Sequence, residues 1–172
     1  MLDNKQMLRD IESEVKFTRN MICGSAFNDR VMQAIAGHKI LSVIATDDSV
    51  VPLSSRLART RGLPHNEPGA ALLTVRKDLA RERLQQHNCN IPEFSVCAFV
   101  DVSQQAASLP YPVVVKPLML SASRGVMRAN DDQEFIAAAA RLKAIVDKEP
   151  VSDYEQAHFL VEEFLAGDEI AL

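Results

Sequence analysis

The residues best suited to chemistry follow a short apolar run near the middle of the chain. Three valines at positions 113–115 precede Lys116, and a loop of small and polar residues follows at positions 121–126. Successive backbone N–H groups in such a loop form an anion-binding concavity, and a lysine ammonium adds a compact positive charge. The combination indicates a site for phosphate oxygens, although a strand-ending lysine alone is usually just solvated.

A second group of polar residues lies near the end of the chain. Apolar residues at positions 159–161 lead into Glu162 and Glu163, and a Gly-Asp turn at positions 167–168 precedes Glu169. Carboxylates only accept hydrogen bonds, whereas ribose hydroxyls and an exocyclic amine donate them. The two groups together predict a nucleotide site, with phosphates at one end and base and ribose at the other. Taken alone, paired glutamates more often form the exposed side of a strand.

The strands that must hold these residues can be predicted from the sequence. The run of β-branched residues before Lys116 predicts a strand at residues 111–116 that is covered on both faces. Pro117 restricts Lys116 to extended backbone and ends the ladder. Further strands are expected at residues 94–100, directly after the small-residue loop, and before Glu162.

Helices are predicted between these strands. A turn of helix starts at residues 68–73, and a helix at residues 77–86 is expected to turn Ala80 and Leu84 inward. A longer helix, capped by the polar residues at 130–132, runs to about residue 146. Its buried stripe is expected to consist of Phe135, Ala139, Leu142 and Val146. A charged turn with a proline breaker is expected at residues 148–155.

The first 64 residues are predicted to form part of an α/β unit. Helical character is expected at residues 1–20 and 27–37, and an apolar strand at residues 40–45. Polar side chains at 46–49, Asp47 among them, can cap a following helix that ends at Gly62. A strand followed by a capped helix is typical of half a βαβ unit. His65 is expected to be a loop residue.

Several of these segments, in this order, resemble the ATP-grasp family of carboxylate–amine ligases. The resemblance covers about residues 40–172. It rests on the strand that ends in Lys116, the loop at 121–126 and the segment at 159–169. Three segments are most similar to the L-amino acid ligase and carbamoyl phosphate synthetase-like branch: residues 62–66, residues 76–81 and residues 123–126. Another branch, such as a carboxylase or a purine-synthesis ligase, stays open.

The resemblance implies an α/β fold of the α+β ATP-grasp type. Residues 1–67 would be a partial α/β region preceding the ATP-grasp domain, and residues 68–172 the N-terminal part of that domain. The acidic and asparagine ligands that hold magnesium in the family would lie beyond Leu172. The expectation is therefore a fragment that binds nucleotide weakly at best, with no catalytic residue and no metal ligand of its own.

The resemblance also implies a set of ATP-binding residues. Lys77 and Lys116 would contact phosphates, the loop would close over them, and Arg81 would brace its helix. Glu162 would accept from the adenine amino group, the backbone near Glu163 and Leu165 would pair with the ring edge, and Glu169 would bind the ribose. The full set is Lys77, Lys116, Ser121, Ser123, Arg124, Gly125, Val126, Glu162, Glu163, Phe164, Leu165 and Glu169. Phe164 either covers the base or fills the core. The loop holds fewer glycines than many ATP-grasp loops, which predicts a stiffer lid.

The functional hypothesis has two forms. In the first, the chain is the ATP-binding half of an ATP-dependent ligase that joins a small carboxylate to an amine through an acyl phosphate, with ATP and Mg²⁺ as cofactors. In the second, it is a non-catalytic nucleotide-binding or scaffolding module that kept the fold. A homodimer is compatible with both forms.

Composition excludes several other classes. The net charge of −4 over 172 residues gives no basic footprint for nucleic acid. The three cysteines are odd in number and show no Cys-x-x-Cys spacing, which indicates reduced thiols in a cytoplasmic protein. The first residues are charged throughout, which does not fit a signal peptide, and no apolar run is long enough to span a membrane. The four histidines show no helical ligand pair.

Overall fold

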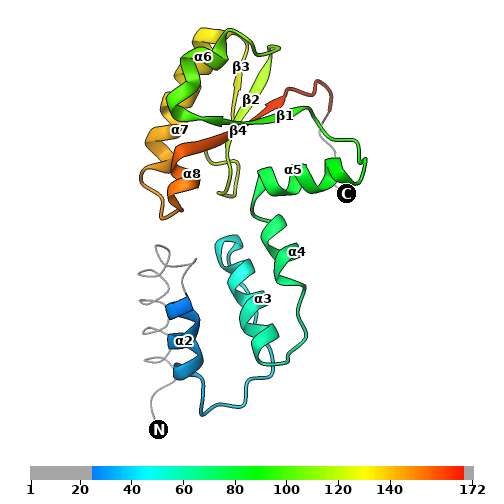
Figure 1. The fold of residues 1–172 in the computed structure, drawn as a ribbon, viewed down its shortest axis with the longest axis vertical. Helices are drawn as coiled ribbons and strands as arrows, with labels where there is room; N and C mark the ends of the chain where they lie inside the picture. The colour runs from blue at the N-terminus through cyan, green and yellow to red at the C-terminus, as the bar shows by residue number, and fades with distance from the viewer. Residues whose placement is uncertain (1–24, 169–172) are drawn as a thin grey trace. The chain divides into compact units, whose positions relative to one another are not determined.

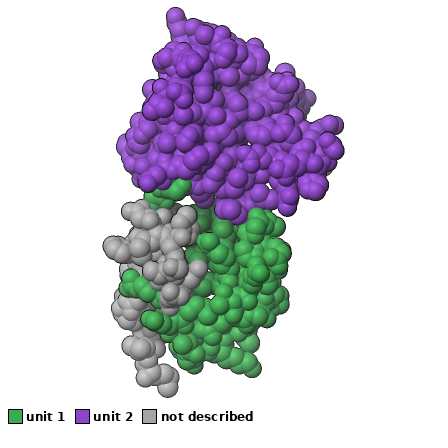
Figure 2. Space-filling view, in the orientation of Figure 1, with its two compact units in different colours: residues 1–71, 150–152 green, residues 72–149, 153–172 purple. Residues whose placement is uncertain are grey.

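The computed structural model describes residues 25–168. These residues divide into two compact units (Figure 2). Unit 1 contains the chain up to Ala71 together with residues 150–152, and unit 2 contains residues 72–149 and the chain from Asp153 onward. Within the described range, no helix has the length and apolar character needed to cross a membrane.

Unit 1 is built around helix α3 (Val51–Thr60), with α2 (Ser25–Ala34) preceding it and α4 (Pro68–Leu73) beginning beyond it. The Asp47 side chain accepts a 2.9 Å hydrogen bond from the Ser49 N–H and caps the 3₁₀ turn η2 (Asp48–Val50) that leads into α3. The expected helix cap is confirmed. Leu53 and Leu57 of α3 are buried and form the centre of a small apolar cluster.

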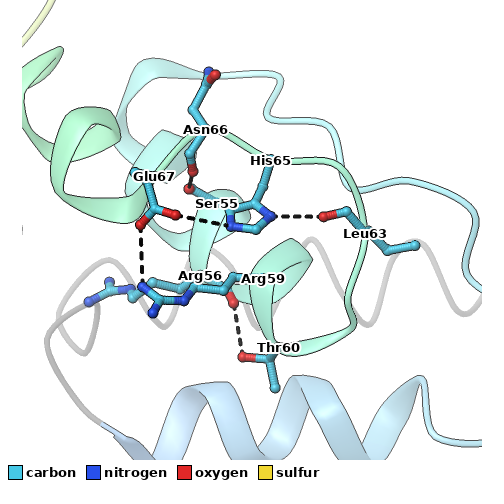
Figure 3. Close-up of polar contacts among 8 residues, drawn as sticks. All are labelled: Ser55, Arg56, Arg59, Thr60, Leu63, His65, Asn66 and Glu67. Atoms are coloured by element: carbon cyan, nitrogen blue, oxygen red, sulfur yellow. Dashed lines mark hydrogen bonds and ion pairs between the residues drawn. The ribbon is translucent and has the colours of Figure 1, made fainter.

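The loop after α3 is fastened back onto that helix (Figure 3). The Ser55 hydroxyl donates to the Asn66 carbonyl, and His65 Nδ1–H donates to the Leu63 carbonyl at 2.8 Å. Glu67 lies 3.5 Å from the Arg59 guanidinium, but both side chains are exposed, so this ion pair contributes little stability. His65 is a loop residue, as predicted.

The predicted strand at residues 40–45 is wrong. These residues have no regular secondary structure, and Leu41 and Ile44 are 74% and 79% exposed. A strand needs a neighbour to pair its backbone N–H and C=O groups, and none of the described residues of unit 1 supplies one. The helix predicted at 27–37 is present as α2 but ends at Ala34. The helix predicted at 1–20 lies outside the described residues.

Unit 2 contains a four-stranded antiparallel sheet in the order β1-β4-β2-β3 (Figure 1). The strands are β1 (Phe94–Ala98), β2 (Val113–Pro117), β3 (Met127–Ala129) and β4 (His158–Glu163). All were expected from the sequence. The first ends at Ala98 instead of residue 100, and it is followed by a 3₁₀ turn η3 (Phe99–Asp101) and helix α6 (Val102–Ala106).

One face of the sheet is covered by α6 and by α7 (Asp132–Val146) (Figure 1). Val115 pairs with Val161 and Pro117 with Phe159, which puts all four on this covered face. The Phe135 and Phe159 ring centroids lie 6.0 Å apart across the interface. Asp131 caps α7 through the Glu134 N–H at 2.8 Å. The predicted helical stripe is confirmed: it is buried at Phe135, Ala139, Leu142 and Val146.

The opposite face carries the charged residues. Val114 pairs with both Glu162 and Arg128, and Lys116 pairs with Leu160, so these side chains alternate away from α7. The expected burial of both faces of β2 holds only for the α7 side, because Val114 and Lys116 are partly exposed. The register therefore places Lys116 and Glu162 diagonally on one surface.

Helix α5 (Lys77–Gln86) has the predicted bounds but not the predicted inward face. Leu84 is 37% exposed, and the buried residue of α5 is Asp78, at 2% exposure. A buried carboxylate at this position is compensated by Arg76, which sits just before the helix. The charged turn after α7 gives way to a short helix, α8 (Asp153–Ala157), before β4.

Candidate functional site

Two cations from different elements meet one buried carboxylate on the face of the sheet opposite α7. Glu162 Oε2 lies 2.5 Å from the Lys116 ammonium, and Glu162 Oε1 lies 2.7 Å from Arg81 Nε. The Glu162 side chain is 4% exposed, whereas Lys116 and Arg81 are 18% and 28% exposed. Both cationic side chains are therefore partly exposed, and the buried carboxylate contacts both of them.

The charge of this cluster is set by its hydrogen bonds. Burial acts to raise the pKa of Glu162, but hydrogen bonds from Arg81 and Lys116 outweigh burial and hold that pKa below its ordinary value. Glu162 is thus ionised at neutral pH, and the three side chains together carry a net charge of about +1. A partly exposed cluster of this sign suits an anionic ligand.

Lys77, at the start of α5, is joined to the segment that follows β2. Its backbone N–H donates to the Leu118 carbonyl at 2.9 Å. Its ammonium donates to the carbonyls of Met119 and Leu120 at 3.0 and 2.7 Å. The first turn of α5 and the start of the β2–β3 loop are therefore one connected structure.

The β2–β3 loop has an unusual backbone. Leu120, Ala122, Ser123 and Gly125 all have positive φ, between 53° and 79°. Three of these four are not glycine, although a side chain disfavours this conformation. Left-handed backbone of this kind also occurs in loops whose N–H groups bind anions. The phosphate-binding role of the loop stays a prediction.

Arg124 does not point into a shared site with the two lysines in this structure. Its guanidinium forms a two-point ion pair with Glu149, just past α7, at 2.9 and 3.1 Å. The Glu149 side chain is 15% exposed. This pairing fastens the tip of the loop to the residues after α7, and contact of Arg124 with a phosphate would require the pair to separate.

Gly125 is the loop residue least able to accept a side chain. Its φ is +79°, and an added Cβ would lie 2.8 Å from Leu142 Cδ1, in the buried core. We expect Gly125→Ala to lower the free energy of unfolding of unit 2 by about 1–3 kcal/mol, because the new side chain both strains the backbone and clashes with the core. Both tyrosines of the chain, Tyr111 and Tyr154, lie in unit 2, and there is no tryptophan. Tyrosine fluorescence in a urea titration therefore reports on this unit.

The matched control is Gly69→Ala. Gly69 has no atom within 4 Å of an added Cβ and no positive φ. Its replacement should leave the urea midpoint of the tyrosine fluorescence transition unchanged from that of the original chain. An equal shift for both variants would contradict the role given to Gly125.

The chain segment after β4 is fixed by backbone pairing. The Glu163 N–H donates to the Glu93 carbonyl at 2.8 Å, and the Phe164 N–H donates to the Pro112 carbonyl at 3.2 Å. Leu165 is 61% exposed. The Arg128 guanidinium lies 4.0 Å from the centre of the Phe164 ring, so this partly exposed ring stacks on a cation instead of filling the core. Glu169 lies outside the described residues.

The structure thus brings some of the predicted residues together and leaves others apart. Lys116 meets Glu162, and Lys77 meets the loop, whereas Arg124 is held by Glu149. Sequence reasoning gave Arg81 only a bracing role and gave Arg128 none. The i, i+4 spacing of Lys77 and Arg81 on one helix was the signal that could have identified the first. For Arg128, the available signal was strand alternation: in β3 its side chain must point to the face opposite its apolar neighbours Met127 and Ala129.

The described residues also bear on metal binding. Among residues 25–168, no group of three or more His, Cys, Asp and Glu side chains is arranged to hold a metal ion. No magnesium ligand is therefore assigned within this range.

Comparison with known proteins shows which family and which solved structures the chain resembles. Residues 109–172 match the family described as the ATP-grasp domain. The L-amino acid ligase of Bacillus licheniformis has a similar structure, with a TM-score of 0.67 and 24% identity over 81% of this chain and 33% of the ligase. The predicted resemblance to ATP-grasp proteins and the mixed helix and antiparallel-sheet fold are confirmed.

Two further relatives are similar over part of the chain. A D-alanine–D-alanine ligase of Anaplasma centrale is 26% identical over 106 residues, which are 62% of this chain and 47% of the ligase. The biotin carboxylase domain of the Hydrogenobacter thermophilus 2-oxoglutarate carboxylase, solved with MgADP and bicarbonate, has a TM-score of 0.61 and 14% identity over 80% of this chain and 31% of that one. The chain thus matches about half the length of its curated relative. These similarities extend the likeness to two further enzymes without assigning an activity to this chain.

Proposed function

We propose that unit 2 recognises ATP, and that the protein to which this chain belongs is an ATP-dependent carboxylate–amine ligase. The observation that carries the proposal is the Arg81–Glu162–Lys116 cluster on the face of the sheet opposite α7. The cluster offers two partly exposed cations to bind phosphate oxygens and one buried carboxylate to accept a hydrogen bond from the adenine amino group. The β2–β3 loop, with its positive-φ residues, lies at the end of the same strand that carries Lys116.

The chemistry of the site residues fits a nucleotide. Lys77 and Lys116 would bind phosphate oxygens as charged donors, and the loop containing Ser121, Ser123 and Val126 would cover them. Glu162 would accept from the adenine amino group, and the backbone from Glu163 to Leu165 would border the ring. Phe164 and the residues near Glu169 would complete the adenosine end.

In the proposed reaction, ATP supplies a phosphoryl group. A carboxylate oxygen attacks the γ-phosphorus, the bond to the β-phosphate oxygen breaks, and ADP leaves. An amine then attacks the acyl phosphate, loses a proton, and releases inorganic phosphate. Positioning and charge neutralisation dominate such transfers. Residues 25–168 would supply phosphate and adenosine contacts, and Mg²⁺ would accompany ATP with ligands from elsewhere.

Two further parts of the proposal concern organisation. Residues 1–67 would be the end of an α/β region that precedes the ATP-grasp domain, and the domain would begin near residue 68. Similarity to both the L-amino acid and D-alanine ligases favours an amino acid as one substrate. The proposed environment is the cytoplasm.

Titration calorimetry tests the nucleotide assignment. ATP with magnesium, adenosine and inorganic tripolyphosphate are each titrated into the chain. We expect ATP to bind at least about tenfold more tightly than either part, because both ends of the site then contribute. Binding of tripolyphosphate as tight as ATP would mean a general anion site, and absence of ATP binding would overturn the proposal.

A further inference from the structure

A buried ion network flanks Lys77 on both sides in the sequence. Arg76 Nε and Nη2 donate to the two carboxylate oxygens of Asp78 at 2.9 and 2.6 Å, and Arg76 Nη1 donates to Glu155 Oε1 at 3.2 Å. The three side chains are 15%, 3% and 9% exposed, respectively. The Arg76 guanidinium also lies 5.6 Å from the centre of the Tyr154 ring. This network, here called the Arg76 network, joins the start of α5 to α8.

Stability alone is a weak reason for such a network. Removing three charged groups from water costs several kcal/mol per ion, and apolar side chains of similar volume often replace buried ion pairs without loss. What the Arg76 network does supply is a fixed geometry, because a planar guanidinium with three carboxylate contacts permits one orientation. Hydrogen bonding to Asp78 raises the pKa of Arg76 and keeps it charged.

The fixed geometry has a direct consequence for Lys77. Arg76 and Asp78 are its two neighbours in the chain, so their contact sets the backbone at the first turn of α5. The Lys77 N–H is then aligned with the Leu118 carbonyl, and its ammonium reaches the carbonyls of Met119 and Leu120. Each of these carbonyls belongs to the segment that enters the positive-φ loop.

We propose that Arg76 is a positioning residue, which holds Lys77 and the entry to the β2–β3 loop in the geometry that receives the nucleotide phosphates. This inference rests on the proposed ATP site but assigns a role that the sequence did not give to Arg76, Asp78 or Glu155. Arg76 itself touches no nucleotide. Arg76 acts through Lys77, which is proposed to bind phosphate. Loss of Arg76 should therefore weaken the binding of ATP but not of adenosine, which has no phosphate.

A double-mutant cycle tests the proposal. ATP and adenosine affinities are measured for the original chain, Arg76→Met, Lys77→Met and the double variant. We expect Arg76→Met to weaken ATP binding by about 10- to 100-fold, the range that misplacement of a binding group produces, and to leave adenosine binding unchanged. In the Lys77→Met background, Arg76→Met should cause little further loss. The matched control is Arg83→Met, an exposed position on the same helix.

Hydrogen exchange supplies a readout that needs no nucleotide. Arg76→Met should accelerate exchange of the Lys77 amide, which donates to Leu118, while exchange in β1 stays unchanged. If the original chain binds no ATP, the proposed function fails, and the exchange result still decides whether Arg76 holds Lys77. Equal losses of ATP and adenosine binding, an additive cycle, or an unchanged Lys77 amide would each overturn the proposal.

Discussion

Lys116→Met should weaken ATP binding by roughly 10- to 100-fold, because a hydrogen bond to a charged group contributes about 1.5–3 kcal/mol. Methionine keeps the length and apolar stem of lysine but removes the ammonium. The variant also leaves Glu162 with Arg81 as its remaining cation in the cluster. Titration calorimetry measures the affinity, and a urea titration of the same sample measures how much stability is lost with it.

The control for this prediction is Lys148→Met, which removes an exposed ammonium from the segment after α7. It should change neither ATP affinity nor stability beyond about 0.5 kcal/mol. An unchanged ATP affinity in Lys116→Met would show that the Arg81–Glu162–Lys116 cluster is structural. A loss for both lysines would indicate a general charge effect, which added salt would reduce.

Phe135→Ala should destabilise unit 2 by about 3–5 kcal/mol, the usual cost of deleting a buried aromatic ring. Phe135 is fully buried, and its ring lies 6.0 Å from the Phe159 ring and 6.4 Å from the Tyr111 ring. Removal therefore opens a cavity between α7 and the sheet. Urea denaturation followed by circular dichroism measures the loss without depending on the emission of Tyr111.

The next residue on α7 provides the comparison. Ile136 is 41% exposed, so Ile136→Ala should cost no more than about 1 kcal/mol. A similar cost for both variants would mean that α7 does not cover the sheet through its Phe135 face.

Much of unit 2 was predictable because local and tertiary preferences agree there. The valines at 113–115 favour a strand, and the Asp131 cap and the stripe from Phe135 to Val146 favour the helix that packs on it. The small-residue loop was identified, but its left-handed backbone at Ala122 and Ser123 was not. Nothing in the residue types requires that conformation.

The errors occurred where long-range contacts outweigh the local pattern. Residues 40–45 read as an apolar strand, but strand formation depends on a pairing neighbour that a local pattern does not reveal. Leu84 was expected to face inward, whereas α5 buries Asp78 instead, because Arg76 and Glu155 compensate its charge. Glu155 is far along the chain from Asp78, so no window of sequence contains the reason.

The candidate site was predictable in its residue types and less so in its pairing. Lys116 and Glu162 were both singled out, and the sheet register that joins them follows from two strands adjacent in space but separated in sequence. The Arg124–Glu149 pair was not foreseen, because Glu149 lies far along the chain and the loop was predicted only as a lid over the phosphates. Which of the predicted residues touch a nucleotide stays a prediction.

Hydrogen exchange with and without a non-hydrolysable ATP analogue tests the central claim most directly. The claim is that Lys77, the β2–β3 loop and the end of β4 serve one ligand. We predict that the analogue slows exchange in all three segments over the same range of concentration: residues 77–86, 118–126 and 159–165. Exchange in α2 and α3 should not change. Protection confined to other segments, or no protection at saturating analogue, would contradict it.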